Sequence, residues 1–309
     1  MIEKTYTVDV GPVCLSALLV APEGDVRGLV QISHGMIEMK ERYLPLMRFL
    51  AGHGYACQIH DHRGHGKSVR SAADLGYLYE QGHRMLPQDV LEMSNRLRAM
   101  YRGKKLCLIG HSMGSLVSLN CLKRYPAAFD AMLLSGCPCA NPAVGAGLAL
   151  VQILKLFRGE RARSPLAEKI MFGPYQRRFR PVSPYNWINT DPEEIRLHET
   201  DPQMNYAFTL NGYDALLRLL KYAHGPVPFC PKRQDMPVLL LAGEEDPCIG
   251  SVNALQDTAN RLKRDGYTDV SVKTWPGMRH EVFRAPEKEL VFQETLAFLD
   301  RILEDRNEH

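Results

Sequence analysis

The stretch LCLIGHSMGSLVSL, residues 106–119, decides the fold. Its first part, LCLIG, is a continuous apolar run typical of a buried strand, and the residues after Ser112 carry apolar side chains at helical spacing, at positions 116, 117, 119 and 122. Ser112 lies at the junction, in a Gly-x-Ser-x-Gly pattern. Gly110 and Gly114 lack the side chains that would clash in a sharp turn from strand to helix. The pattern predicts a nucleophilic serine above the end of a strand, and the alternative is a packed glycine turn.

The segments around this stretch also alternate between strand and helix patterns. Apolar runs of this kind indicate strands buried on both faces of a parallel sheet. We expect such strands at 28–33, 55–60, 106–110, 131–136, 238–246 and 270–277, and helices near 43–53, 87–101, 251–265 and 287–304. TYTVDV and VCLSALLV are expected to pair as an antiparallel hairpin at the sheet edge, with Gly11-Pro12 as the turn. The chain is therefore predicted to have an α/β fold, with a mostly parallel central sheet flanked by helices.

The alternation stops over residues 138–236, which are rich in Pro, Arg and Tyr and contain no clear strand. This composition is typical of an insertion, and we expect a mainly helical cap that follows the sixth strand. The predicted organisation is thus a core in two parts, 1–137 and 237–309, with the cap (lid) at 138–236 between them.

A nucleophilic serine needs a histidine base, and that histidine needs a carboxylate to orient it. Sites in open α/β sheets lie at the carboxyl ends of strands, which narrows the choice among eleven histidines. His280 follows VSVKTWPGM after a single residue, Arg279, and Asp246 ends VLLLAGEED. The sequence predicts a catalytic triad of Ser112, Asp246 and His280. Glu244 and Glu245 are the rival carboxylates, and the alternative for His280 is a solvated loop histidine.

Two backbone N–H groups are expected to stabilise the oxyanion. Met113 follows the nucleophile at the start of a helix, where N–H groups and the helix dipole favour negative charge. The second donor is expected in the loop after GLVQIS, which reads His34-Gly35-Met36, and the candidate is the N–H of Met36. Gly35 allows close approach of the backbone, and His34 is expected to brace the loop as a buried, hydrogen-bonded histidine.

Composition argues against several other classes of protein. A formal charge of +3 in 309 residues, with no matching motif, gives no support for a nucleic-acid partner. The longest apolar window, 143–157, is shorter than the roughly 20 residues of a membrane span.

Eight cysteines lie mostly in apolar runs, and the first ten residues alternate like a strand rather than a signal peptide, so a cytoplasmic setting is expected. Cys137-Pro138-Cys139 has neither redox nor zinc spacing, which favours a structural role.

The segment HDHRGHG, residues 60–66, contains three histidines and an aspartate that could suggest a metal site. Its spacing does not match common zinc patterns. Because it follows a predicted strand, Asp61 and Arg63 are expected to organise a loop by hydrogen bonds. We therefore expect no metal and no cofactor.

Five motifs, SHGMIEMKERY, DHRGHGKS, GHSMGS, GEEDP and WPGMRHE, together resemble the monoacylglycerol lipase and lysophospholipase branch of the α/β-hydrolase superfamily, a branch often labelled serine aminopeptidase-like. The resemblance covers nearly the whole chain and extends into the insertion, where FGPYQRRFRP and NWINTDPEEIRLHETDP resemble the cap of bacterial lysophospholipase-like members. It implies the same triad and the same two oxyanion donors. One departure is Glu38-Met39, where many members have Glu-His.

The predicted function is a serine hydrolase that cleaves carboxylic esters, of monoacylglycerol or lysophospholipid type, through an acyl-enzyme. The expected partner is a single-chain lipid ester, without nucleic acid or an obligate protein partner. One alternative is an aminopeptidase similar to proline iminopeptidase, which would hold a substrate ammonium with cap carboxylates such as Glu193, Glu194, Glu199 and Asp201. A short-chain carboxylesterase, a cofactor-free perhydrolase and a non-catalytic binding protein are further alternatives.

The cap is expected to select the substrate, because it should lie over the mouth of the site. Leu148, Val151, Leu154 and Phe157 recur at helical spacing and are candidates for an apolar acyl-chain lining, although packing of the cap on the core explains the same pattern. The segment from 155 to 180 contains only two acidic residues, 160 and 168, but eight Lys or Arg residues (155, 158, 161, 163, 169, 177, 178 and 180). This excess suggests contact with a membrane surface or a substrate phosphate, and a solvated surface is the alternative.

Overall fold

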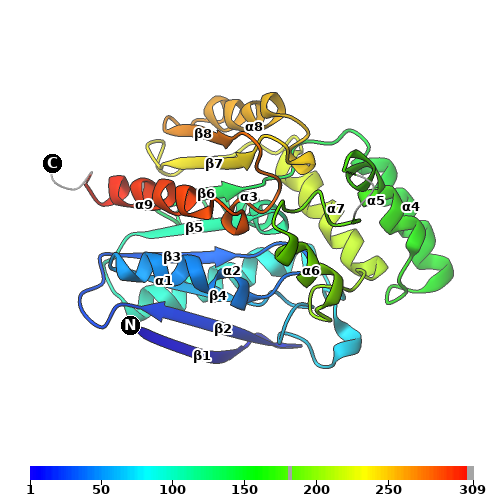
Figure 1. Cartoon of the computed structure of the whole chain (residues 1–309), viewed down its shortest axis with the longest axis horizontal. Coiled ribbons are helices and arrows are strands. Elements are labelled where there is room, and N and C mark those ends of the chain that lie inside the picture. Colours follow the sequence, from blue (N-terminus) through cyan, green and yellow to red (C-terminus); the bar gives the residue numbers. More distant parts are fainter. Residues whose placement is uncertain (180–182, 305–309) are drawn as a thin grey trace.

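A computed structural model describes residues 1–179 and 183–304 and contains one eight-stranded sheet (Figure 1). The strands are β1 (Ile2–Asp9), β2 (Cys14–Ala21), β3 (Gly28–Ser33), β4 (Tyr55–His60), β5 (Leu106–His111), β6 (Ala131–Ser135), β7 (Val238–Gly243) and β8 (Val270–Trp275). Their order across the sheet is β1-β2-β4-β3-β5-β6-β7-β8. β1 and β2 form the predicted hairpin, β2 runs antiparallel to β4, and the remaining neighbours are parallel. The predicted fold class is confirmed.

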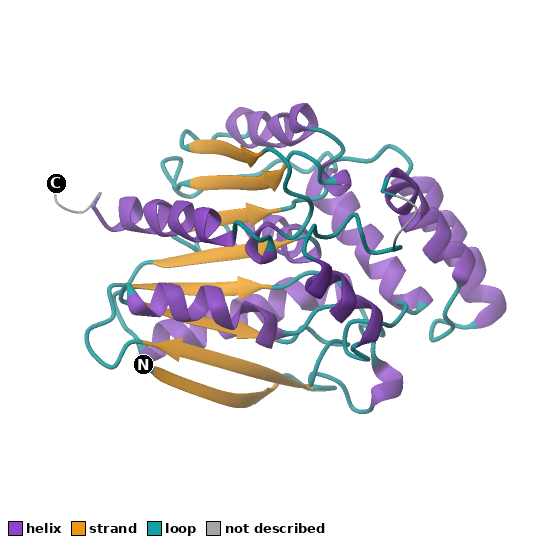
Figure 2. Cartoon of the chain, viewed as in Figure 1, coloured by secondary structure: helices purple, strands orange, loops and turns teal. Residues whose placement is uncertain are grey.

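Helices cover both faces of this sheet (Figure 2). Strand β5 shows why: Leu106 and Leu108 belong to one apolar core, whereas Cys107 and Ile109 belong to the other. Alternate side chains of a strand point to opposite faces, so an entirely apolar strand needs cover on both. One face packs against α1 (Leu44–Gly52) and α9 (Lys288–Glu304), and the other against α2 (Gly82–Met100), α3 (Met113–Arg124) and α8 (Val252–Arg264).

These helices agree with the expected ranges except at the start of α2. That helix begins at Gly82, and Pro87 lies inside it. A proline is best tolerated in the first turn of a helix, and here it lies in the second turn. The earlier turn is closely packed: Leu86 is fully buried, and an ideal Cβ on Gly82 would lie 2.7 Å from Leu78 Cβ and 3.4 Å from Ala215 Cβ.

Among the described residues, four helices lie between β6 and β7: α4 (Val144–Arg158), α5 (Pro165–Arg178), α6 (Pro192–Thr200) and α7 (Leu210–His224). In Figure 1 they gather beyond the carboxyl ends of the central strands. α7 packs against α2 and α3, and α4 packs in turn against α7. Short 3-10 helices complete the described elements at Lys40–Tyr43, Ala72–Asp74, Pro247–Ile249 and Val282–Arg284. Within the described ranges, no helix combines the length and apolar character that crossing a membrane requires.

Candidate active site

Ser112 occupies a sharp turn between β5 and α3. Its backbone angles, φ 53° and ψ −118°, are rarely adopted by residues other than glycine. A Cβ on Gly114 would lie 1.9 Å from the Ser33 carbonyl oxygen, and one on Gly110 would lie 2.6 Å from the Gly114 oxygen. Only glycine fits at these two positions, so the Gly-x-Ser-x-Gly pattern is a steric requirement of the turn. The turn presents the serine at the carboxyl end of β5.

The structure brings the three predicted triad side chains together. Ser112 Oγ lies 2.8 Å from His280 Nε2, and His280 Nδ1 lies 2.9 Å from Asp246 Oδ2. The other Asp246 oxygen accepts the backbone N–H of Cys248 at 2.8 Å. The two rival carboxylates lie elsewhere: Glu244 accepts a hydrogen bond from Thr274, and Glu245 lies 3.6 Å from Arg279. This arrangement allows the imidazole to take the serine proton while the carboxylate fixes its tautomer.

Burial and charge act in opposite directions on the imidazole of His280. Burial alone would lower the pKa of His280, but the adjacent Asp246 carboxylate raises this pKa well above the ordinary histidine value. The ring of His111 lies 4.8 Å from that of His280, centroid to centroid. Burial lowers the pKa of His111 to about 4, so it is neutral at neutral pH. The triad base therefore has an uncharged aromatic neighbour rather than a competing cation.

The two predicted oxyanion donors lie beside Ser112. Met36 and Met113 line the same cavity as Ser112, and Met113 is the first residue of α3. Across residues 1–179 and 183–304, the backbone N–H of neither methionine has a protein acceptor. The loop is braced by His34, whose Nδ1–H donates to the Gly35 carbonyl at 2.8 Å and whose Nε2 accepts the His62 N–H at 2.8 Å. Both N–H groups are thus free to receive a negative oxygen.

A family model described as "Serine aminopeptidase, S33" matches residues 24–287. The chain belongs to this S33 family. Over 281 residues it is 26% identical to a monoacylglycerol lipase of Mycolicibacterium smegmatis, with 90% of each chain covered. Over 122 residues, 39% of each chain, it is 33% identical to the monoglyceride lipase of Homo sapiens. The resemblance inferred from the motifs is confirmed.

Solved structures show that this S33 family member has the α/β-hydrolase fold. A highly thermostable carboxyl esterase from Bacillus coagulans gives a TM-score of 0.89 at 22% identity, covering 98% of this chain and 99% of the other. A monoglyceride lipase from Saccharomyces cerevisiae, solved with a substrate analogue, gives 0.72 at 18% identity, covering 98% and 97%.

A cavity of about 470 Å³ opens onto Ser112 in this α/β-hydrolase. Its walls are mainly apolar and come from the helices between β6 and β7, with Val144, Leu150, Met171, Phe172, Leu217 and Leu220 among them. Glu38, His198 and Glu281 form a polar part of the same wall. A largely apolar pocket with a few polar groups at one side fits an amphipathic small molecule.

The predicted acyl-chain lining was wrong. Of the described residues that line the cavity, none is Leu148, Val151, Leu154 or Phe157. Only the first half of α4, including Val144 and Leu150, reaches the cavity. Further along, Val151 is buried in the core, whereas Phe157 is 85% exposed. Helical spacing identified an apolar stripe, but the position of the site along the helix axis decides which turns of that stripe touch substrate.

The HDHRGHG segment is a packed loop in this hydrolase. His60, His62 and His65 are fully buried, and Asp61 accepts hydrogen bonds from the backbone and side chain of Lys40. Arg63 forms a two-point ion pair with Asp89 at 2.7 Å. In the described part of the chain, two groups of possible metal ligands have atoms within 4.8 Å of one another: Asp246, Cys248 and His280, and Glu38, His111 and Glu281. The histidines of the segment belong to neither group.

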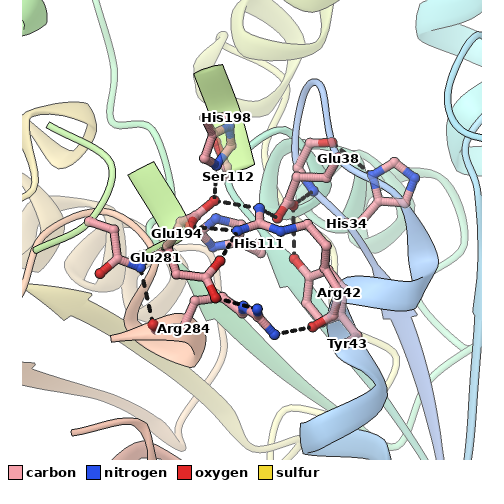
Figure 3. A network of polar contacts seen from close by, with 12 residues as sticks. His34, Glu38, Arg42, Tyr43, His111, Ser112, Glu194, His198, Glu281 and Arg284 are labelled. Carbon is pink, nitrogen blue, oxygen red and sulfur yellow. Dashed lines mark hydrogen bonds and ion pairs between the residues drawn. The ribbon is translucent and has the colours of Figure 1, made fainter. Parts of the chain in front are cut away.

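Sequence reasoning missed a buried ion-pair network beside the triad (Figure 3). Arg42 contacts Glu38, Glu194 and Glu281, which come from three separate segments of the chain. Glu38 keeps its supporting role despite the Glu38-Met39 departure from the family pattern, because it accepts the Gly35 N–H at 2.6 Å. The motif SHGMIEMKERY contains Glu38 and Arg42 at helical spacing, but it gives no sign of the partners that lie far away in the sequence.

Proposed function

We propose that this S33 family member is a serine hydrolase that cleaves carboxylic esters of monoacylglycerol or lysophospholipid type. The observation that carries the proposal is the continuous hydrogen-bonded series from Ser112 Oγ through His280 to Asp246 at the floor of a mainly apolar cavity. The names of the relatives, monoacylglycerol lipase and probable lysophospholipase among them, support the same chemistry.

The proposed reaction is two-step acyl transfer. His280 Nε2 takes the proton of Ser112 Oγ as this oxygen attacks the ester carbonyl, and the N–H groups of Met36 and Met113 stabilise the resulting oxyanion. His280 then gives the proton to the leaving alcohol as the carbon–oxygen bond breaks. Water, deprotonated by the same imidazole, attacks the acyl-enzyme. The imidazolium then returns this proton to Ser112 Oγ as the acyl carbon–oxygen bond breaks, which releases the fatty acid and free Ser112. These steps require no metal or cofactor.

The cavity supports a substrate with one apolar chain and a polar headgroup. Apolar side chains of α4, α5 and α7 bury an acyl chain, which gains roughly 0.8 kcal/mol for each methylene removed from water. The headgroup is proposed to lie against Glu38, His198 and Glu281. In this assignment residues 138–236 act as the cap, and residues 1–137 and 237–309 form the catalytic core.

The aminopeptidase alternative is less well supported. The cap carboxylates considered for an ammonium ion do not line the cavity among its described residues. Glu194 contacts Arg42 and Arg284, and Glu193 pairs with Arg196 on an exposed face of α6. Carboxylates that are already neutralised by guanidinium groups offer little to an amino group. Both alternatives would use the same triad, but a short-chain carboxylesterase is the stronger one, since it needs no carboxylate to hold an ammonium ion.

A substrate series tests the proposal. Purified protein is assayed with monoacylglycerols and lysophospholipids of increasing chain length, with para-nitrophenyl butyrate, and with an aminoacyl anilide. We expect kcat/KM to rise with chain length and the anilide to be cleaved at background rates. Highest activity on butyrate would favour a short-chain carboxylesterase, and preference for the anilide would favour an aminopeptidase.

We also propose that the tip of the cap contacts an anionic lipid surface. Leu156 and Phe157, at the end of α4, are each 85% exposed. Within the described ranges Arg158, which follows Phe157 in the sequence, and Lys169 of α5 have no acidic partner, whereas Lys155 and Arg161 pair with Asp214 and Asp74. Arg180, which belongs to the predicted basic stretch, lies outside the described residues. Exposed apolar side chains beside unpaired cations are typical of peripheral membrane contact.

A further inference from the structure

Arg42 lies where three parts of the site meet. Its guanidinium is buried, with 3% of the side chain exposed. Nη1 donates to Glu38 Oε1 at 2.7 Å and to Glu281 Oε1 at 2.6 Å. Nη2 donates to Glu281 Oε2 at 2.9 Å and to Glu194 Oε2 at 2.8 Å. One planar cation therefore joins the loop after β3, the residue that follows His280, and helix α6 (Figure 3).

The Glu38 end of this network holds the loop that carries an oxyanion donor. Glu38 Oε2, the oxygen not bonded to Arg42, accepts the Gly35 N–H at 2.6 Å and the Tyr43 hydroxyl at 3.0 Å. Gly35 immediately precedes Met36. The orientation of the Met36 N–H thus depends on a carboxylate that Arg42 holds in place.

The other end of the network is in the cap. Glu194 and His198 lie one turn apart on α6, and both point into the network. Glu194 contacts Arg284 as well as Arg42, and His198 Nε2 donates to Glu281 Oε1 at 3.0 Å. Arg284 also donates to the backbone carbonyl of Arg42 at 2.9 Å. Helix α6 is therefore bonded to the segments that carry the triad base and one oxyanion donor.

We propose that Glu194 is a positioning residue, which couples the seating of α6 on Arg42 to the geometry of the oxyanion hole. The inference rests on the proposed function, because it assigns a role in the same acyl transfer. Without the Glu194 carboxylate, Arg284 loses its acidic partner and Arg42 loses its anchor on α6. The loop from Gly35 to Glu38 then gains freedom, and a displacement of about 1 Å at a catalytic group can cost up to ~100-fold in rate.

Glu194→Gln tests this role with little risk to folding. The network holds three carboxylates, Glu38, Glu194 and Glu281, and two guanidinium groups, Arg42 and Arg284. The amide substitution leaves two charges of each sign, so no unbalanced cation is created. Glu193→Gln is the matched control, because Glu193 is the preceding residue of α6 and pairs with Arg196 with its side chain 60% exposed.

Both variants and the wild type are assayed on para-nitrophenyl butyrate and decanoate, labelled with a fluorophosphonate, and followed by thermal unfolding. We expect Glu194→Gln to lower kcat about tenfold on both esters and to slow labelling similarly, at assay temperatures where it is folded. Glu193→Gln should stay within about twofold of the wild type. A loss confined to KM for decanoate would overturn the positioning role, since it would indicate acyl-chain binding, and so would unchanged kcat.

A second set of variants tests the coupling through Arg42. Arg42→Lys keeps the charge but not the planar fork that bridges the carboxylates, so kcat should fall at least as far as in Glu194→Gln. If Glu194 acts through Arg42, the double variant should be no slower than Arg42→Lys alone. If the fold-losses in kcat of the two single variants multiply in the double variant, the two residues act independently and the coupling is contradicted. A wild type that is not labelled at Ser112 would instead reject the proposed function, which separates the two failures.

Discussion

Ser112 Oγ and His280 Nε2 lie 2.8 Å apart, although 168 residues separate them in the sequence. The turn at the end of β5 holds the serine, and the loop after β8 holds the histidine. The imidazole has two aromatic neighbours, His111 and Trp187, whose ring centroids lie 4.8 Å and 5.2 Å from its own. Trp187 belongs to the insertion. A residue of the proposed cap therefore packs against the proposed base.

The pH dependence of kcat/KM should report the titration of His280. The base must be neutral to accept the serine proton, and the adjacent Asp246 carboxylate raises the pKa of His280 above the ordinary histidine value of about 6.5, despite the opposing effect of burial. Activity should therefore rise with pH, with the midpoint of the acid limb above 6.5. An acid limb centred below pH 6 would contradict this assignment.

Gly114→Ala should prevent the turn at Ser112 from forming, because its Cβ would lie 1.9 Å from the Ser33 carbonyl oxygen. We expect a loss of at least about 2 kcal/mol in the free energy of unfolding, together with loss of esterase activity. Gly52→Ala in α1 is the control, since its Cβ meets nothing within 4 Å. Chemical denaturation measures the free energy of unfolding of both variants, and an ester assay measures their activity. A Gly114→Ala protein as stable and active as wild type would refute the steric requirement.

Leu150→Trp should shorten the acyl chain that the cavity accepts, because Leu150 lines the cavity from α4. We expect kcat/KM for a decanoyl ester to fall ~10-fold or more, with butyrate cleavage retained. Leu156→Trp on the same helix is the control, since this side chain is 85% exposed. Equal effects of the two substitutions on soluble esters would show that this wall does not hold the acyl chain.

Leu156→Ser and Phe157→Ser should each weaken binding to vesicles that contain anionic lipid, by about tenfold, because each removes an exposed apolar side chain from the tip of the cap. Cleavage of soluble esters should not change. Leu290→Ser on α9, where the side chain is 59% exposed, serves as the control outside the insertion. If vesicle binding by the wild type depends on neither the salt concentration nor the anionic lipid content, the proposed lipid contact is rejected.

Most of the fold could be predicted from local sequence patterns. Apolar runs such as LCLIG indicate doubly buried strands, and the spacing of Ser112, Asp246 and His280 relative to those runs predicts that their side chains meet at one edge of the sheet. The rule that sites gather at strand ends supplies this long-range information without knowledge of individual contacts.

Two features could not be predicted, for different physical reasons. The Arg42 network depends on contacts with Glu194 and Glu281, which are 152 and 239 residues away, and nothing in the local pattern selects these partners. The acyl-chain wall depends on how α4 lies relative to Ser112. An apolar stripe runs along the whole helix, so helical periodicity cannot tell Leu150, which lines the cavity, from Phe157, which is exposed.

The role of Ser112 is the central claim, and Ser112→Ala tests it most directly when combined with fluorophosphonate labelling. The account predicts that kcat/KM on para-nitrophenyl esters falls by roughly 10⁴- to 10⁶-fold in a protein that remains folded. It also predicts that the label attaches to Ser112 in the wild type and is absent from the variant. Near wild-type esterase activity in Ser112→Ala, or labelling at another residue, would contradict the account.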